Sequence, residues 1–184
     1  MKAFLCNNIY FLDSLEVCFL SLVDIILKRR SIRHYKPDPV PEDLLNKILE
    51  AGRLAPTAGN QQPWHFIVVT DMKLKQELSK GRWNTFIKDS AFTIVGCGYV
   101  GSEYGRKWST VDVSIALENM VIAAEAQGLG SCWIGDFKEE EVKRLLGIPD
   151  DYKIVCLISF GYPAEHPSPR GKKTLQEIVG YNKF

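Results

Sequence analysis

The chain has 184 residues, of which 46% are hydrophobic and 24% are charged. Lysine and arginine together number 23 and aspartate and glutamate 22, so the formal net charge is +1. One globular domain with a sizeable core is expected, and disordered, collagen-like and multi-domain chains are excluded. Without a basic excess the protein is a poor candidate for coating nucleic acid, although a local anion site remains open.

The cysteines and histidines are scattered, with no C-x-x-C pair and no H-x-x-x-H spacing. Such a set indicates neither a disulfide framework nor a zinc site. We therefore expect no structural metal and a reducing, cytoplasmic location. The residues are Cys6, Cys18, Cys97, Cys132, Cys156, His34, His65 and His166.

Residues 1–21 are expected to form a helical extension that precedes a single domain over 22–184. The apolar stretch Ala3–Leu12 leads to no small-residue cleavage site, which argues against a signal peptide. In the apolar run that follows, which Asp13, Glu16 and Asp24 interrupt, the longest stretch between charges is Val17–Val23, far shorter than the ~20 residues that span a bilayer. Apolar residues three or four positions apart predict an amphipathic helix; they are Leu15, Phe19, Leu22 and Ile26. This helix is expected to end near Lys28–Arg30 and to pack on its own protein.

The first half of the chain then predicts two helices and two strands. After a proline-containing extended stretch, a helix begins at Pro41 and ends before Pro56. A strand over 64–70 is rich in aromatic and β-branched side chains. A short helix over 72–80 precedes an almost continuously apolar strand over 91–97, which is typical of a sheet covered on both faces.

The second half predicts two further helices and two strands. The clearest helix covers 110–127, and a strand over 131–134 follows it. Asp136, with an acidic residue three positions later, has capping-box spacing and predicts a helix that ends at Gly147. A strand over 153–160 precedes an irregular tail rich in proline and basic residues. Interspersed strands and helices favour an α/β or α+β sandwich.

The segment Gly96–Gly101 matches G-x-G-x-x-G directly after a predicted strand. A dinucleotide site needs a helix to begin at these glycines, so that its N-terminus faces the pyrophosphate. Here a polar loop over 102–108 follows, and the helix is expected only near Ser109. We therefore interpret the segment as a glycine-rich strand exit rather than a Rossmann site.

Two other segments are candidates for ligand binding. Arg29–Arg33 contains three guanidinium groups and a hydroxyl, which can grip a phosphate. Equally, these cations can complement the C-terminal dipole of the preceding helix. The loop 56–64 combines small residues with side-chain amides that suit a flat heterocycle, although a plain polar connection is the simpler interpretation.

Four motifs, in order along the chain, resemble those of the FMN-dependent nitroreductase family. The first is Arg29-Arg30-Ser31-Ile32-Arg33, and the second is Pro56-Thr57-x-x-Asn60-x-Gln62-Pro63-Trp64-x-Phe66. The third is Gly128-Leu129-Gly130-Ser131-Cys132-Trp133-Ile134-Gly135, and the fourth is the basic C-terminal segment Pro169–Val179. The resemblance runs from residue 23 to residue 179.

The resemblance implies an α+β three-layer sandwich, with a central, mostly antiparallel sheet between helices. It implies a homodimer with FMN at the subunit interface and NAD(P)H as electron donor. The implied activity is ping-pong reduction of nitroaromatics, quinones or flavins, with the chemistry at flavin N5 and no catalytic side chain. A dehalogenase-like or flavin-cleaving enzyme, and an FMN-binding protein without turnover, are the alternatives.

Site residues follow from the resemblance, position by position. Arg29, Arg30, Ser31 and Arg33 would anchor the phosphate and ribityl end, with Arg33 also reaching the pyrimidine edge. Arg170 and Lys172 would complete the phosphate site. The partner subunit would supply Pro56, Thr57, Ala58, Asn60 and Gln61, while Ile134 and Gly135 would place backbone groups beside N5.

Some positions depart from the family or invite a functional interpretation. The segment 98–109 is too short for the helical insertion that covers the flavin in larger relatives, and Lys172 stands where many relatives have Arg. Plainer roles are expected elsewhere: a packed or surface His65, a buried structural Cys132, and packing in the core or an interface for Trp83 and Trp108.

Overall fold

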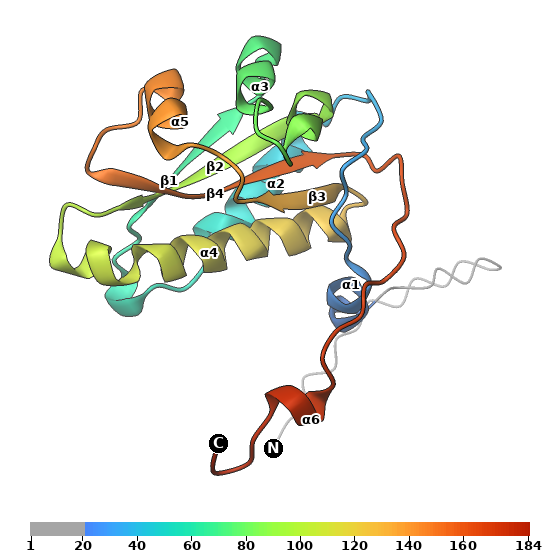
Figure 1. The fold of residues 1–184 in the computed structure, drawn as a ribbon, viewed down its shortest axis with the longest axis vertical. Coiled ribbons are helices and arrows are strands. Elements are labelled where there is room, and N and C mark those ends of the chain that lie inside the picture. The colour runs from blue at the N-terminus through green and yellow to red at the C-terminus, as the bar shows by residue number, and fades with distance from the viewer. Residues whose placement is uncertain (1–20) are drawn as a thin grey trace, which may run out of the picture.

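The computed structural model describes residues 21–184, so the predicted helix positions Leu15 and Phe19 lie outside the described residues. At its centre is a four-stranded antiparallel sheet in the order β1-β2-β4-β3 (Figure 1). The strands are β1 (Trp64–Val69), β2 (Phe92–Tyr99), β3 (Gly130–Ile134) and β4 (Tyr152–Gly161). Every predicted strand is present, with ends within two residues of the expected ones.

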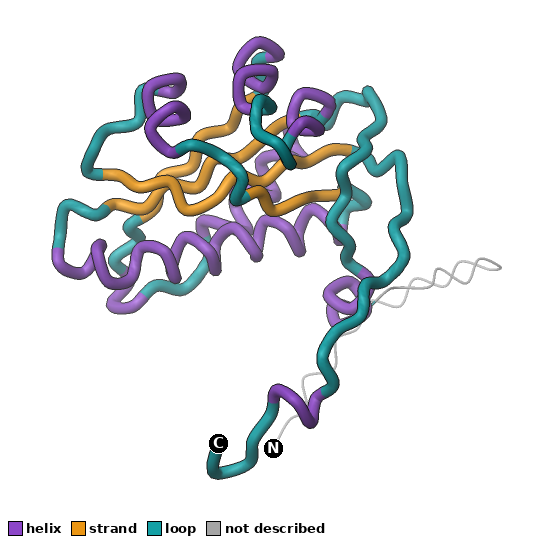
Figure 2. Tube along the Cα trace, in the orientation of Figure 1, coloured by secondary structure: helices purple, strands orange, loops and turns teal. Residues whose placement is uncertain are grey.

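Helices cover both faces of this sheet, which confirms the expected three-layer α+β sandwich (Figures 1 and 2). On one face lie α2 (Glu42–Arg53) and the long α4 (Glu103–Ala126). On the other lie α3 (Met72–Leu78), the short 3-10 helix η2 (Thr85–Asp89) and α5 (Glu139–Leu146). Outside the layers, α1 (Leu22–Lys28) lies near the C-terminal end of α4, and the tail with α6 (Leu175–Ile178) extends away.

Each face of the sheet carries its own hydrophobic core. Toward α2 and α4, the core includes Phe92, Leu117 and Phe160, with the two phenylalanine rings stacked at 5.0 Å between centroids. Toward α3 and α5, it includes Val95 and Leu157. These cores account for the continuously apolar β2, because alternate side chains of one strand enter both of them.

Glycines in β2 let α4 lie close to the sheet. A Cβ placed on Gly96 would sit 2.6 Å from Cδ1 of Leu117, and one on Gly98 would sit 2.8 Å from Cβ of Ser109. Both glycines are paired within the antiparallel sheet rather than placed before a helix N-terminus. The G-x-G-x-x-G match is therefore a packing feature of a strand and not a dinucleotide fingerprint.

Three predicted details are wrong. Leu22 and Ile26, expected to pack on their own protein, are 65% and 51% exposed, because α1 lies outside the layers and buries none of its residues. The helix expected from residue 110 begins at Glu103, because the Ser102 hydroxyl accepts a hydrogen bond from Gly105 N at 3.0 Å and starts the helix there. The segment interpreted as a polar loop is thus the first part of α4. Asp136 does not cap α5, whose N-cap residue is Lys138, because the Asp136 carboxylate hydrogen-bonds to Trp83 N instead.

Other helix boundaries agree with the sequence. Gly147 ends α5 in the left-handed conformation with φ of 67°, and Gly128 follows the end of α4 with φ of 79°. Pro41 is the N-cap of α2, one residue before the helix begins. Within residues 21–184, no helix is long and apolar enough to cross a membrane.

The packing of α4 on β2 yields a first prediction. Gly96→Ala should lower the free energy of unfolding by about 1–3 kcal/mol, because the added methyl group overlaps Leu117 in a filled core. Denaturant titration would measure this change. Gly171→Ala is the control, since a Cβ there meets nothing within 4 Å. Adding Leu117→Val to the first variant should recover part of the loss; equal midpoints for all variants would contradict the packing argument.

Candidate functional site

The segment Arg29–Arg33 runs beside the edge strand β3. Ile32 N donates to Ser131 O at 2.9 Å, and a single β-bridge joins Ser31 to Ser131. Further along, the buried Tyr35 hydroxyl donates to Ile32 O at 2.7 Å and lies 2.8 Å from the Ser159 hydroxyl. Burial, only partly offset by that contact, raises the pKa of Tyr35, so the hydroxyl stays a donor. The arginine segment is therefore fixed against the sheet.

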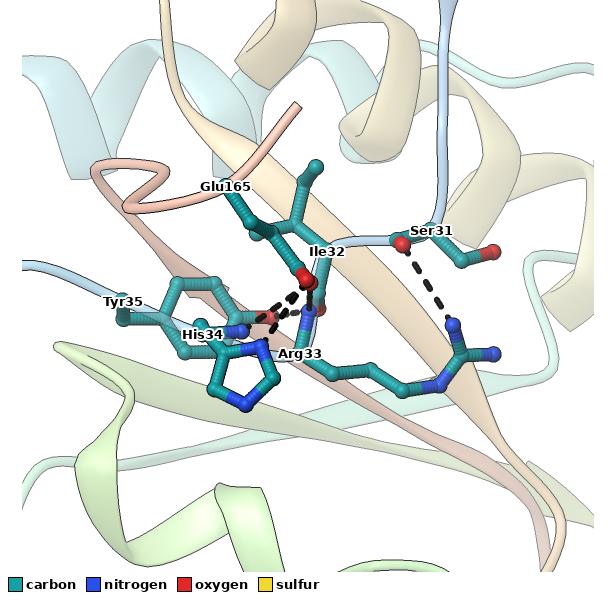
Figure 3. A network of polar contacts seen from close by, with 6 residues as sticks. All are labelled: Ser31, Ile32, Arg33, His34, Tyr35 and Glu165. Carbon is teal, nitrogen blue, oxygen red and sulfur yellow. Dashed lines mark hydrogen bonds and ion pairs between the residues drawn. The ribbon is translucent and has the colours of Figure 1, made fainter. Parts of the chain in front are cut away.

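Glu165, from the chain after β4, closes this segment from the other side (Figure 3). Its carboxylate accepts hydrogen bonds from Arg33 N at 2.5 Å and His34 N at 3.1 Å, and its second oxygen lies 2.8 Å from His34 Nδ1. Burial alone would raise the pKa of Glu165, but these contacts hold it below its ordinary value of 4.5. With its backbone held in this way, Arg33 directs its guanidinium away from Glu165 (Figure 3).

The arginines divide into two roles. Arg30 Nη1 donates to the carbonyls of Leu27, Lys28 and Arg29 at 2.9–3.1 Å, so it caps the C-terminus of α1. Among residues 21–184, Arg29 and Arg33 make no salt bridge. The helix-dipole interpretation therefore describes Arg30, while Arg33 Nη1 donates to the Ser31 carbonyl at 3.4 Å.

Two buried polar atoms beside these arginines lack partners. Neither Arg29 Nη1 nor the Ser131 hydroxyl has a hydrogen-bond partner within the described chain, although both are shielded from solvent. An unsatisfied buried group costs about 1–3 kcal/mol, and more when it is charged. An unpartnered guanidinium donor two residues before the Ser31–Ser131 bridge fits an oxygen of a phosphate group.

The loop 56–61 adopts a tight, locally hydrogen-bonded shape. It contains the 3-10 turn η1 (Ala58–Asn60), with positive φ at Gly59 and Asn60. The Thr57 hydroxyl accepts from Gln62 N at 3.1 Å, and the Gln62 amide donates to Asn60 O at 3.1 Å. Because these contacts use Thr57 and Gln62 internally, the loop presents a preformed surface.

The arginine segment and this loop lie at opposite ends of α4. Gln61 shares a pocket with Tyr104 in the first turn of the helix, whereas Arg30 shares one with Glu125 in the last turn. A helix of 24 residues spans about 36 Å at about 1.5 Å per residue. One chain therefore does not bring its own Arg29–Arg33 and 56–61 together.

The end of β3 joins a segment that sequence reasoning missed. Ile134 is buried, and Gly135 has open space where a Cβ would point. The next residue, Asp136, accepts from Trp83 N at 2.5 Å, and Asn84 Nδ2 donates to Asp136 O at 2.7 Å. The loop before η2 is thereby held against the predicted flavin segment.

Phe86 links the same loop to the arginine segment. The Arg33 guanidinium carbon lies 6.0 Å from the centre of the Phe86 ring. Residues 82–86 therefore lie between two predicted cofactor-binding segments, Arg29–Arg33 and Ile134–Gly135. No sequence motif indicated a role for these residues. The sequence offered only an arginine followed by a tryptophan, Arg82-Trp83, ahead of a predicted strand.

Several other predicted residues have plain positions. Arg170 and Lys172 are exposed on the extended tail, and the structure describes no contact between them and the other predicted site residues. His65 is on the surface near Tyr152, and burial raises the pKa of the Cys132 thiol, as expected for a structural cysteine. Trp83 and Trp108 are 69% and 38% exposed, so neither belongs to the core of this chain.

Metal-ligating side chains do not gather in the described part of the chain. Residues 21–184 contain no group of three or more His, Cys, Asp or Glu side chains arranged to hold a metal ion. The three cysteines in this range, Cys97, Cys132 and Cys156, are free and buried.

Comparison with known proteins places this geometry in a family. The model of the nitroreductase family matches residues 26–91 and 76–162. An Archaeoglobus fulgidus protein provisionally named NADH dehydrogenase/NAD(P)H nitroreductase is 37% identical, over 77% of this chain and 84% of its own length. A crystallised FMN-dependent nitroreductase from Clostridium difficile R20291 has a TM-score of 0.80 and 32% identity, covering 88% of this chain and 99% of its own.

A relative with another activity also matches. An iodotyrosine deiodinase from Thermotoga neapolitana is 28% identical, over 89% of this chain and 98% of its own length. The fold and the matched range define an oxidoreductase. The chain belongs to the nitroreductase family.

The Glu165 contacts yield a second prediction. A lowered pKa means that the carboxylate stabilises the folded state above about pH 4.5, and that this contribution is lost as the pH falls through the lowered pKa. Glu165→Gln should therefore reduce the free energy of unfolding at pH 7 by about 1–2 kcal/mol. Denaturant titrations at several pH values would show the two proteins converging below pH 4.5.

The control for this experiment is Glu50→Gln. Glu50 pairs with Arg53 on the exposed surface of α2, where an ion pair contributes less. A loss for Glu165→Gln that is no larger than that of the control, or that persists unchanged at low pH, would show that Glu165 does not hold the segment.

Proposed function

We propose that this protein is an FMN-dependent oxidoreductase that uses NAD(P)H to reduce nitroaromatics, quinones or flavins by a ping-pong mechanism. The observation that carries the proposal is the buried Arg29 Nη1, which has no hydrogen-bond partner within the described chain, on the same short segment as Arg33, which makes no salt bridge there. The oxygens of an anionic group would satisfy these donors. The FMN named for the Clostridium difficile relative carries a phosphate group of the required chemistry.

The residues divide the work of holding the cofactor. Bound FMN supplies the hydride chemistry, while the protein provides position and charge. Arg29 and Ser31 would bind the phosphate, and Arg33 would place positive charge toward the pyrimidine edge, where negative charge develops on reduction. Arg30 acts indirectly, because capping α1 fixes the backbone from which its neighbours project.

Ile134 and Gly135 form the floor beside the reacting edge of the flavin. Their backbone groups follow directly from a strand that is hydrogen-bonded to β4, so they are held rigidly. No side chain occupies the open side of Gly135. This leaves room for nicotinamide and then an acceptor to enter the same place in turn, as a ping-pong reaction requires.

The site is completed by a second copy of the chain. In this proposal the partner subunit contributes loop 56–61, including Pro56, Thr57, Ala58, Asn60 and Gln61, because the two segments are about 36 Å apart along α4 of one chain. Exposed apolar side chains support the pairing, since such surface seeks a partner. They are Leu22, Val23, Ile26 and Leu27 on α1 and Trp108, Val111 and Ile115 on α4.

The basic tail has a place in the same assembly. Arg170 and Lys172 are exposed on a segment that leaves the sandwich, so they are free to reach a phosphate site formed by two chains (Figure 1). Lysine supplies charge there without the bidentate geometry of arginine. Its contribution should therefore be the smaller and the more sensitive to salt.

Reductive dehalogenation is a second candidate, favoured by the match to the Thermotoga neapolitana iodotyrosine deiodinase. Turnover of NAD(P)H with menadione or a nitroaromatic, compared with halide release from an iodinated phenol, separates the two reactions. Absence of turnover with every acceptor would instead identify an FMN-binding protein without redox function, and loss of intact flavin under oxygen would identify a flavin-cleaving enzyme.

Mixed dimers provide a third prediction and test the shared site. Arg33→Ala and Asn60→Ala homodimers should each bind FMN weakly. A heterodimer of the two variants should regain one intact site, because one chain keeps Arg33 and the other keeps Asn60. Differently tagged chains, purified together and titrated with FMN, should bind about one tight FMN per dimer. If each site belonged to a single chain, the heterodimer would have no tight site.

Phosphate recognition provides a fourth prediction. Removing one charged hydrogen-bonding partner costs about 1.5–3 kcal/mol, so Arg33→Ala should weaken FMN binding by roughly ten- to a hundredfold at ~1.4 kcal/mol per decade. Flavin fluorescence titration would measure the change. Riboflavin, which lacks the phosphate, should bind the unaltered protein poorly and respond little to Arg29→Ala. Equal affinity for FMN and riboflavin would contradict the assignment.

A further inference from the structure

A large cavity opens next to the predicted flavin segment, on the face of the sheet that carries α3 and α5 (Figure 1). Its volume is about 840 Å³, which is in the range of small-molecule sites. Leu78 and Val142 supply apolar wall, and Asp136, the residue after Gly135, lines its edge. A molecule whose reactive ring lies beside Gly135 can therefore extend into this cavity.

The charges around the cavity do not cancel one another. Four basic side chains line it, together with three carboxylates. All three carboxylates are engaged: Glu77 pairs with Lys80, Glu141 with Lys138 at 2.9 Å, and Asp136 accepts from Trp83 N. The remaining cations, Arg82 and Arg144, have no carboxylate partner among residues 21–184. Arg144 Nε donates to the Glu140 carbonyl at 3.3 Å, and Asp136 likewise has no cation partner among these residues, so the lining keeps a small net positive charge for an anionic ligand.

Arg82 is held in place rather than free in solution. Its guanidinium carbon lies 4.8 Å from the centre of the Trp83 ring, a cation–π arrangement. Trp83 N is bonded to Asp136, and Asn84, which is 1% exposed, donates to Leu78 O at 2.9 Å and Asp136 O at 2.7 Å. These hydrogen bonds fix the backbone next to Arg82 relative to Gly135, which brings its guanidinium to the mouth of the cavity.

From this arrangement we infer that the cavity between α3 and α5 binds the phosphate groups of the nicotinamide nucleotide, with Arg82 and Arg144 as the phosphate-binding residues. The inference rests on the proposed function, since it assumes that the nicotinamide ring reacts beside Gly135. A nucleotide carries two or three phosphates several bonds from that ring, which matches a pair of guanidinium groups beyond the reacting edge. The chain thereby recognises a dinucleotide without a Rossmann unit.

The test measures binding without turnover. The FMN-loaded protein is titrated by calorimetry with 2′,5′-ADP and with ADP, which carry phosphates but no nicotinamide. Arg82→Ala and Arg144→Ala should each weaken binding of these probes by roughly five- to tenfold at low salt, with a smaller effect as salt is added. Lys47→Ala, which removes one positive charge from α2 on the opposite face, is the control and should change neither dissociation constant.

Steady-state kinetics separate the nucleotide from an anionic acceptor. Both arginine variants should raise KM for NADH or NADPH and leave kcat and the KM for neutral nitrobenzene unchanged. Unaltered probe and nucleotide binding would overturn the inference, and so would a rise confined to the KM for 4-nitrobenzoate. The proposed function fails separately, if the unaltered protein neither binds FMN nor oxidises NAD(P)H.

Discussion

The close approach of α4 to β2 is the constraint on which the rest of the molecule depends. With no side chains at Gly96 and Gly98, the helix lies close enough for Leu117 to fill the core between them. The helix is then rigid over its full length, since both α2 and the sheet pack on it. Loop 56–61 and the arginine segment lie at its two ends, so the packing also sets how far apart these segments lie.

A second constraint acts at the edge of the sheet formed by β3. The arginine segment is held by Tyr35, by Glu165 and by the bridge from Ser31 to Ser131. These contacts are made to backbone groups of the segment and leave its guanidinium groups out. Polar groups that satisfy one another keep the backbone in place, while neighbouring polar atoms stay unpartnered. Some polar groups thus hold the backbone in place and others remain able to bind a ligand, as a preorganised binding site requires.

Local patterns predicted the sandwich because each strand and most helices are encoded by their own residues. The strand over 64–69 and the glycine after α5 are examples, since side-chain type and backbone freedom determine them without help from distant segments. Asp136 was misinterpreted for the opposite reason. Its spacing suits a cap, but a contact with Trp83, 53 positions away in sequence, uses the carboxylate instead. Local sequence patterns do not show that a distant residue competes for this carboxylate.

The candidate site shows the same limit. The sequence left two roles open for the arginines, and only coordinates separate Arg30, which caps α1, from Arg29, which keeps an unpartnered nitrogen. The loop over 82–86 gave no usable signal, because its importance comes from lying between two distant segments.

The open side of Gly135 has a consequence for how the molecule could change its choice of substrate. A methyl group there would meet no protein atom within 4 Å apart from its chain neighbours, so it would cost the fold little and would project into the space proposed for the substrate. Size exclusion at this point is therefore separable from stability. Evolution or protein design could therefore restrict the size of the rings that are accepted by enlarging this side chain in small steps, with little effect on the stability of the fold.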